Sequence, residues 1–137
     1  MKTQKLLCDA ECYQSTVETA AKLLKNGGIV AIPTETVYGL AASAYDDTAI
    51  KKVFEAKGRP QDNPLIVHIA NMEMLSDVAR DIPEKAFACA EKFWPGPFTM
   101  VLPRTDKTAP CVSAGLSSVA VRMPDHHIAL DIINKSG

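Results

Sequence analysis

Residues 29–69 read IVAIPTETVYGLAASAYDDTAIKKVFEAKGRPQDNPLIVHI. This stretch holds two short apolar runs, at residues 29–32 and 65–67, that have the composition of buried strands. The first run opens into a hydroxyl-rich loop after Pro33, and the second ends at His68. A helical stretch with a cationic end lies between them. Because open α/β sheets bind ligands where strands end, this arrangement predicts a binding crevice.

The rest of the chain alternates helical and extended patterns. Residues 1–14 are expected to form a strand or an extended lead-in, and a rigid loop is expected where prolines flank a glycine at residues 94–97. Side chains that favour helix N-caps are Asp46 or Asp47, Asn71 and Asp125. Helices are predicted over residues 15–25, 46–57, 71–78, 83–93 and 125–134, and further strands over residues 98–102 and 119–123.

This order of elements predicts one α/β or α+β layered domain. The chain has 137 residues, which is the length of a single domain. No helical pattern separates the last two strands, so at least one strand pair is expected to be antiparallel. A mixed parallel and antiparallel sheet is therefore predicted.

Composition excludes several classes of protein. Hydrophobic residues make up 47% of the chain and charged residues 23%, so a packed core is expected rather than disorder. The formal net charge of −1 gives no argument for binding nucleic acid or a membrane surface, and no apolar run is long enough to span a bilayer. Cys8 and Cys12 have three residues between them, not the two of a zinc knuckle. We predict reduced thiols, a cytoplasmic protein and no metal site.

The first candidate site residues are Lys57 and Arg59, which flank Gly58. Pro60 biases Arg59 toward an extended backbone, so the two cations can converge on a phosphate or a carboxylate. The alternative is a helix C-terminus at which cations interact favourably with the helix dipole.

The polar residues at the strand ends also allow two interpretations each. Thr34, Glu35 and Thr36 can bind a small polar ligand or form a turn that satisfies its own backbone. His68 is either a catalytic base or a packed residue at the sheet edge. Arg122 interrupts the apolar run at residues 119–123, so it either faces solvent or meets an anion.

Four segments match motifs of a known family. They are P-T-E-T-V-Y-G-L at residues 33–40, K-G-R-P-x-x-N-P-L at residues 57–65 before His68, W-P-G-P-F-T at residues 94–99, and S-V-A-V-R-M-P at residues 118–124. In this order they resemble the YrdC/Sua5 family of threonylcarbamoyl-AMP synthases, which act in tRNA t6A biosynthesis. The resemblance implies a twisted mixed parallel and antiparallel sheet, flanked by helices, around a cationic concave cavity.

The resemblance also implies a nucleotidyl transfer. L-Threonine, bicarbonate or CO2, and ATP would give threonylcarbamoyl-AMP and pyrophosphate, with Mg²⁺ expected on the triphosphate. Partner proteins would then move the threonylcarbamoyl group to adenosine 37 of tRNA. Such chemistry needs positioned cations rather than a covalent nucleophile.

The motifs imply a role for each matching residue. The residues expected to bind L-threonine are Thr36, His68 and Arg122, with Arg122 on the carboxylate. The residues expected to face ATP are Lys57, Arg59, Asn63 and Ser118, with Lys57 and Arg59 as the catalytic cations on the phosphates. The residues expected to shape the pocket are Thr34, Glu35 and Tyr38.

The sequence departs from the family pattern at its end. Family sequences usually continue with a strand that carries an S-x-N motif, and this sequence ends at Gly137 without one. We therefore expect a single YrdC-like domain over residues 1–137 that is C-terminally incomplete, with exposed sheet edges that favour a homodimer. The alternative functions are a non-catalytic module that binds double-stranded RNA or tRNA, and an inactive fragment. The related domain of hydrogenase-maturation carbamoyltransferases is disfavoured because zinc-type cysteine pairs are absent.

Overall fold

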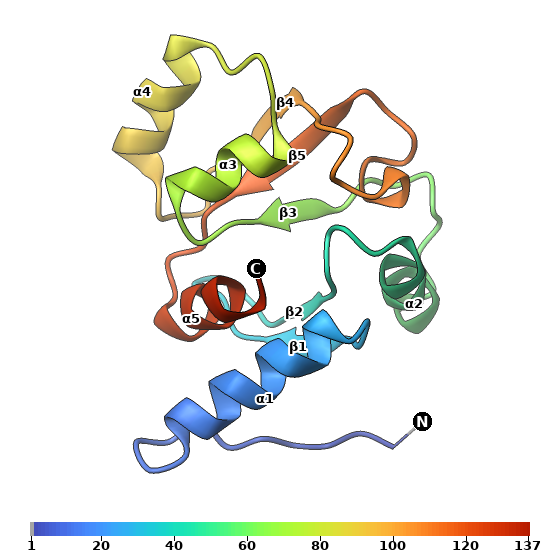
Figure 1. Ribbon diagram of the computed structural model, residues 1–137, viewed down its shortest axis with the longest axis vertical. Coiled ribbons are helices and arrows are strands. Elements are labelled where there is room, and N and C mark those ends of the chain that lie inside the picture. The colour runs from blue at the N-terminus through green and yellow to red at the C-terminus, as the bar shows by residue number, and fades with distance from the viewer. Residues whose placement is uncertain (1) are drawn as a thin grey trace.

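The structure is a computed structural model, and it describes residues 2–137. Figure 1 shows helices around two separate small sheets. The helices are α1 (Tyr13–Lys25), α2 (Asp47–Lys57), α3 (Met72–Val78), α4 (Glu84–Phe93), the short 3₁₀ helix η1 (Pro110–Ser113) and α5 (His127–Ser136). The strands are β1 (Val30–Ile32), β2 (Gly39–Ala41), β3 (Ile66–His68), β4 (Met100–Pro103) and β5 (Ser118–Arg122).

The strands form a two-stranded and a three-stranded sheet. β1 pairs antiparallel with β2. The other sheet has the order β3-β5-β4, in which β3 and β5 are parallel while β4 and β5 are antiparallel. The prediction of a mixed sheet with at least one antiparallel pair is confirmed. The two strands of the opening stretch, β1 and β3, lie in different sheets.

Each sheet has its own hydrophobic core. The larger core packs α2, α3 and α4 against the three-stranded sheet and includes Phe54, Leu75 and Val121. The smaller core joins α1 and α5 to β1 and includes Leu24 and Ile32. Figure 1 shows α1 and α5 side by side, with the three-stranded sheet and α4 at the far end of the molecule. The described residues therefore form two packed units, one around each sheet.

The local sequence explains how α2 begins and ends. The Asp46 carboxylate accepts hydrogen bonds from the backbone N–H groups of Thr48 and Ala49, which confirms the predicted N-cap. Gly58 is left-handed, with φ of 58°. The Gly58 N–H donates to Glu55 O, and the Arg59 N–H donates to Phe54 O. These two bonds form a Schellman motif, which turns the chain sharply between Lys57 and Arg59.

Some sequence predictions are wrong in detail. Asp125 does not cap α5, because the Nδ1 atom of His126 accepts from the Ile128 N–H instead. β2 was not predicted at all, since Gly39, Leu40 and Ala41 carry no strong strand preference. Residues 2–8 form neither a helix nor a strand, so the predicted strand is absent there, and Met1 lies outside the described residues.

Two further properties concern residues 2–137 as a whole. None of their helices is both long and apolar enough to cross a membrane. No three His, Cys, Asp or Glu side chains within the same residues are grouped so that they could hold a metal ion.

The capping geometry yields a paired prediction. Asp46→Ala should lower the free energy of unfolding by about 1 kcal/mol, because two N–H groups of α2 lose their acceptor. Asp125→Ala should change it by less than about 0.5 kcal/mol, because the side chain caps no helix. Urea unfolding of both variants beside the unmodified chain measures the two effects. Equal losses in the two variants would contradict this account of the caps.

Candidate active site

A cavity of about 460 Å³ is lined by residues from both sheets. This volume lies in the range of about 300–1,000 Å³ that is usual for small-molecule sites. Four basic residues line the cavity, and no Asp or Glu is among its lining residues within the described chain. The basic residues are Lys25, Lys57, Arg59 and Arg122. A small anionic ligand therefore fits the charge of this cavity better than a cation does.

The parallel pairing of β3 with β5 brings His68 beside Arg122. The register aligns Val67 with Val121 and His68 with Arg122, which are the last residues of their strands. Since side chains alternate between the faces of a strand, burying Val67 and Val121 in the core turns the next residues the other way. His68 and Arg122 consequently both reach the cavity.

His68 is held in one tautomer by its surroundings. Its Nδ1 atom lies 3.2 Å from the backbone oxygen of Ile66. A carbonyl oxygen only accepts hydrogen bonds, so Nδ1 carries the proton and Nε2 keeps a lone pair. Burial lowers the pKa of His68 from its ordinary value, which favours the neutral ring. Nε2 can then accept a hydrogen bond from a ligand hydroxyl or amine.

The loop after β1 forms the turn that the sequence allowed as an alternative. The Thr34 Oγ1 atom accepts from the backbone N–H groups of Thr36 and Val37 and donates to Val37 O. Thr34 and Thr36 nevertheless line the cavity, and their hydroxyl oxygens are 3.1 Å apart. Tyr38 also lines it but is 75% exposed, which is consistent with a place at the rim.

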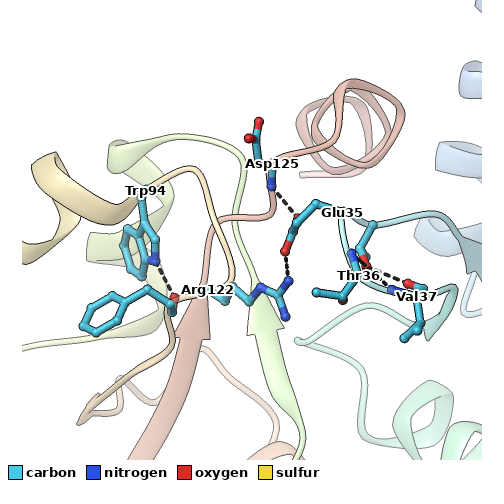
Figure 2. A network of polar contacts seen from close by, with 8 residues as sticks. Glu35, Thr36, Val37, Trp94, Arg122 and Asp125 are labelled. Carbon is cyan, nitrogen blue, oxygen red and sulfur yellow. Dashed lines mark hydrogen bonds and ion pairs between the residues drawn. The ribbon is translucent and has the colours of Figure 1, made fainter.

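Arg122 forms an ion pair with a carboxylate of the protein. Its Nη2 atom forms an ion pair with Glu35 Oε1, and Glu35 Oε2 accepts from the Asp125 N–H at 2.6 Å. Figure 2 shows the Glu35 carboxylate between these two partners. The Arg122 and Glu35 side chains are only 12% and 17% exposed. Arg122 Nε is buried and has no hydrogen-bond partner among residues 2–137, and Glu35 engages only Nη2, so Nη1 is the nitrogen left for a ligand.

Lys57 and Arg59 line the cavity from the turn that ends α2. Arg59 Nη2 donates to Pro64 O at 3.1 Å, which holds the side chain against the loop before β3. Its buried Nε has no partner within the described chain. Neither Lys57 nor Arg59 forms an ion pair with any carboxylate of residues 2–137. Their charges are therefore uncompensated by neighbouring side chains.

Two predicted ATP-facing residues do not line this cavity. Ser118 pairs with Pro103 at the other end of β5, about 13 Å along the strand from Arg122. It lines a separate hollow together with Arg80 and Asp81. Asn63 lies in the loop before β3, where its N–H donates to Pro60 O, and the next residue, Pro64, does line the cavity.

Sequence reasoning missed one cationic member of the cavity. Lys25 lines it from the last turn of α1. The only signal in the sequence was a lysine near a helix C-terminus, which is the usual place for a cation that interacts with the helix dipole.

Residues 22–137 match a model of the Sua5/YciO/YrdC family, whose description is "Telomere recombination". The chain belongs to the Sua5/YciO/YrdC family. This match covers the two strands of the opening stretch and every residue that lines the cavity.

Two relatives within the Sua5/YciO/YrdC family carry the name threonylcarbamoyl-AMP synthase. The protein from Pyrococcus abyssi (strain GE5 / Orsay) is 53% identical over 88% of this chain and 35% of its own length. The protein from Bacillus subtilis (strain 168) is 50% identical over 100% of this chain and 41% of its own length. The chain thus spans about two fifths or less of these relatives.

Solved structures of the family share the fold. P. abyssi Sua5, described as complexed with L-threonine, has a TM-score of 0.88 and 52% identity, covering 90% of this chain and 36% of that protein. Escherichia coli YciO has a TM-score of 0.79 at 20% identity, covering 90% of this chain and 60% of that protein, which shows the fold alone. The predicted YrdC-like fold is confirmed.

The Gly58 turn can be tested with a matched pair of glycines. A Cβ at Gly58 or at Gly39 would meet no heavy atom within 4 Å, but only Gly58 has a positive φ. Gly58→Ala should therefore lower the free energy of unfolding by about 1 kcal/mol, while Gly39→Ala should leave it unchanged or raise it slightly. Chemical denaturation of both variants measures the difference. A Gly58→Ala chain as stable as the Gly39→Ala chain would show that the left-handed turn is not strained by a side chain.

The lowered pKa of His68 predicts a dependence of stability on pH. The unfolded chain binds a proton at His68 near pH 6.5, and the folded chain does so only at lower pH. The contribution of His68 to stability is therefore complete above pH 6.5 and falls as the pH drops below it. Unfolding midpoints are measured at pH 7.5 and 5.5 for the unmodified chain and for His68→Gln. The loss of stability on going to pH 5.5 should be smaller in the variant. Equal losses of stability in the two proteins would argue that burial of His68 does not make stability depend on pH.

Proposed function

We propose that this chain provides the L-threonine and ATP site of a threonylcarbamoyl-AMP synthase. The observation that carries the proposal is that Thr36, Lys57, Arg59, His68 and Arg122 all line one cavity. They come from β3, β5, the end of α2 and two loops, and their positions coincide with the motifs shared with the synthases. The relatives at 50–53% identity and the threonine complex of P. abyssi Sua5 support the same activity.

The proposed reaction proceeds in two steps. The threonine amine attacks CO2 supplied by bicarbonate, forms an N–C bond and loses a proton, which gives a carbamate. A carbamate oxygen then attacks the α-phosphorus of ATP. The bond from that phosphorus to the bridging oxygen breaks, so threonylcarbamoyl-AMP forms and pyrophosphate leaves. The protein's contribution is to align the carbamate with the phosphorus and to stabilise negative charge on the phosphate oxygens.

L-Threonine binds at the end of the cavity formed by β3 and β5. The donors of Arg122 that Glu35 leaves available bind the threonine carboxylate. Nε2 of His68 accepts from the threonine hydroxyl or amine, because Nδ1 is already committed to Ile66. Thr36 adds a hydroxyl from the loop on the opposite side.

ATP binds at the end formed by the α2 turn. Lys57 and Arg59 contact the phosphates and stabilise the charge that develops as pyrophosphate leaves. Asn63 lies two residues before Leu65, which lines the cavity, and contacts the nucleotide from that edge. Ser118 is left out of this assignment because it lines a different hollow.

Mg²⁺ is proposed as a companion of the substrate. The described residues contain no group of acidic or histidine side chains able to hold a metal ion. Triphosphate oxygens are ligands that Mg²⁺ prefers, so the ion arrives with ATP and neutralises part of the charge of the leaving group. Lys57 and Arg59 supply the protein's share of the positive charge.

The fate of the product follows from its chemistry. Threonylcarbamoyl-AMP is a mixed anhydride whose acyl group transfers readily to an amine. Proteins that modify tRNA would take it and place the threonylcarbamoyl group on adenosine 37.

Pyrophosphate release tests the proposed activity. Release from ATP should require both L-threonine and bicarbonate. Arg59→Ala and Arg122→Ala should each lower it by about 10²- to 10³-fold, since each removes a cation from the site. Glu91→Gln is the matched control, because Glu91 is exposed on α4, which lines no part of the cavity. Its rate should equal that of the unmodified chain.

Calorimetry with L-threonine separates the two ends of the site if no pyrophosphate appears. If L-threonine binds and Arg122→Ala abolishes that binding, the assignment of the amino-acid end is supported. The catalytic proposal is then refuted for this chain. An absence of binding would refute both. Titration with tRNA at several salt concentrations tests the alternative module, since electrostatic binding to RNA weakens steeply with salt.

A further inference from the structure

The arginines at the two ends of the cavity differ in their electrostatic surroundings. Arg122 is in an ion pair with Glu35, whereas the only side-chain hydrogen bond of Arg59 within residues 2–137 goes to the backbone oxygen of Pro64. Lys57, beside Arg59, also lacks an ion-pair partner among residues 2–137. One end of the cavity is therefore close to neutral before a ligand arrives, and the other carries a net positive charge.

Glu35 lies behind Arg122 and does not face the ligand. Thr34, Thr36 and Arg122 line the cavity, but Glu35 does not. Its second oxygen is engaged by the Asp125 N–H, so the carboxylate is fixed at both oxygens within the fold (Figure 2). A ligand in the cavity can reach Arg122 without displacing Glu35.

This arrangement affects anions of different charge unequally. A single carboxylate needs two hydrogen bonds and little net charge, and Nη1 of the guanidinium, which has two N–H donors, is not engaged by Glu35. Pyrophosphate or a triphosphate carries several charges, so its binding at Arg122 would place them close to the carboxylate of Glu35 as well. The low exposure of the pair strengthens this repulsion, because little water screens it.

We propose that Glu35 is a specificity-determining residue, which neutralises Arg122 so that this end of the cavity accepts a monocarboxylate and rejects polyphosphate. The inference rests on the proposed function and adds how one cavity keeps its two anionic substrates apart. Polyphosphate is directed to Lys57 and Arg59, whose charges are uncompensated. Glu35 acts through Arg122 and contacts no substrate.

Pyrophosphate binding tests this inference without any turnover. Calorimetry should show that the unmodified chain binds one equivalent of pyrophosphate. Arg59→Ala should abolish this binding. Glu35→Gln keeps an oxygen that can accept from the Asp125 N–H but removes the charge. This variant should bind a second equivalent, with the affinity of the Arg122 end raised about tenfold or more. Adding Arg122→Gln to Glu35→Gln should return the stoichiometry to one.

Two controls keep the test decisive. Glu91→Gln removes an equal charge from exposed α4 and should leave one equivalent. Arg122→Gln in the otherwise unmodified chain should still bind one equivalent of pyrophosphate, because the paired arginine takes no part in that binding. The Arg122→Gln variant therefore tests the inference even if Glu35→Gln does not fold. Loss of the pyrophosphate equivalent in Arg122→Gln alone, or no second equivalent in a folded Glu35→Gln chain, would overturn the inference.

The outcome is separable from that of the proposed function. If the unmodified chain fails to bind L-threonine, the amino-acid assignment fails, while the pyrophosphate stoichiometry still reports whether Glu35 controls Arg122. If pyrophosphate does not bind the unmodified chain, the ATP assignment of Lys57 and Arg59 fails. In that case, binding of one equivalent of pyrophosphate by Glu35→Gln would still support the inference. No binding by that variant would overturn it.

Discussion

The Glu35 carboxylate connects the two units of the fold at the cavity. It belongs to the loop after β1, in the unit built around α1 and α5, and it contacts the end of β5 in the other unit. No strand of one sheet is hydrogen-bonded to a strand of the other within residues 2–137. A buried ion pair contributes little net stability, because desolvation offsets the attraction, but its loss on one side leaves an uncompensated charge. The ion pair therefore fixes how the two units contact each other, and it adds little to the free energy of folding.

The same sheet supplies both the core and the site. In β5 the residues that face the core, Val119 and Val121, are buried, whereas Arg122 follows at the strand end on the opposite face. β3 repeats this pattern with Val67 and His68, and the parallel register places the two polar residues side by side. Because His68 and Arg122 contribute little to apolar packing, their identities can serve ligand binding while the buried valines next to them fix their positions.

Much of this arrangement could be predicted from local sequence. Periodicity and capping residues gave α1, α2 and α3, and polar residues at the ends of apolar runs indicated the cavity. Long-range geometry could not be predicted in the same way. The partner of Arg122 is 87 positions away in the sequence, and no local pattern signals such a contact. Asp125 looked like an N-cap because its side chain suits one, but its backbone N–H is bound to Glu35 and the cap falls one residue later.

The net charge of −1 shows why whole-chain electrostatics gave no indication of this site. No Asp or Glu of residues 2–137 lines the cavity. Four acidic residues are in exposed ion pairs, such as Asp77 with Lys107, which water screens. The cavity gathers four basic residues and no acidic one among the residues that line it, and Glu35 compensates only one of them. The proposed selection between anions therefore rests on the distribution of charge within the cavity, rather than on its sum over the chain. In the proposed synthase reaction an amino acid and a nucleotide both present negative charge to the same small volume, so a separation of charge within the cavity would keep the two substrates apart.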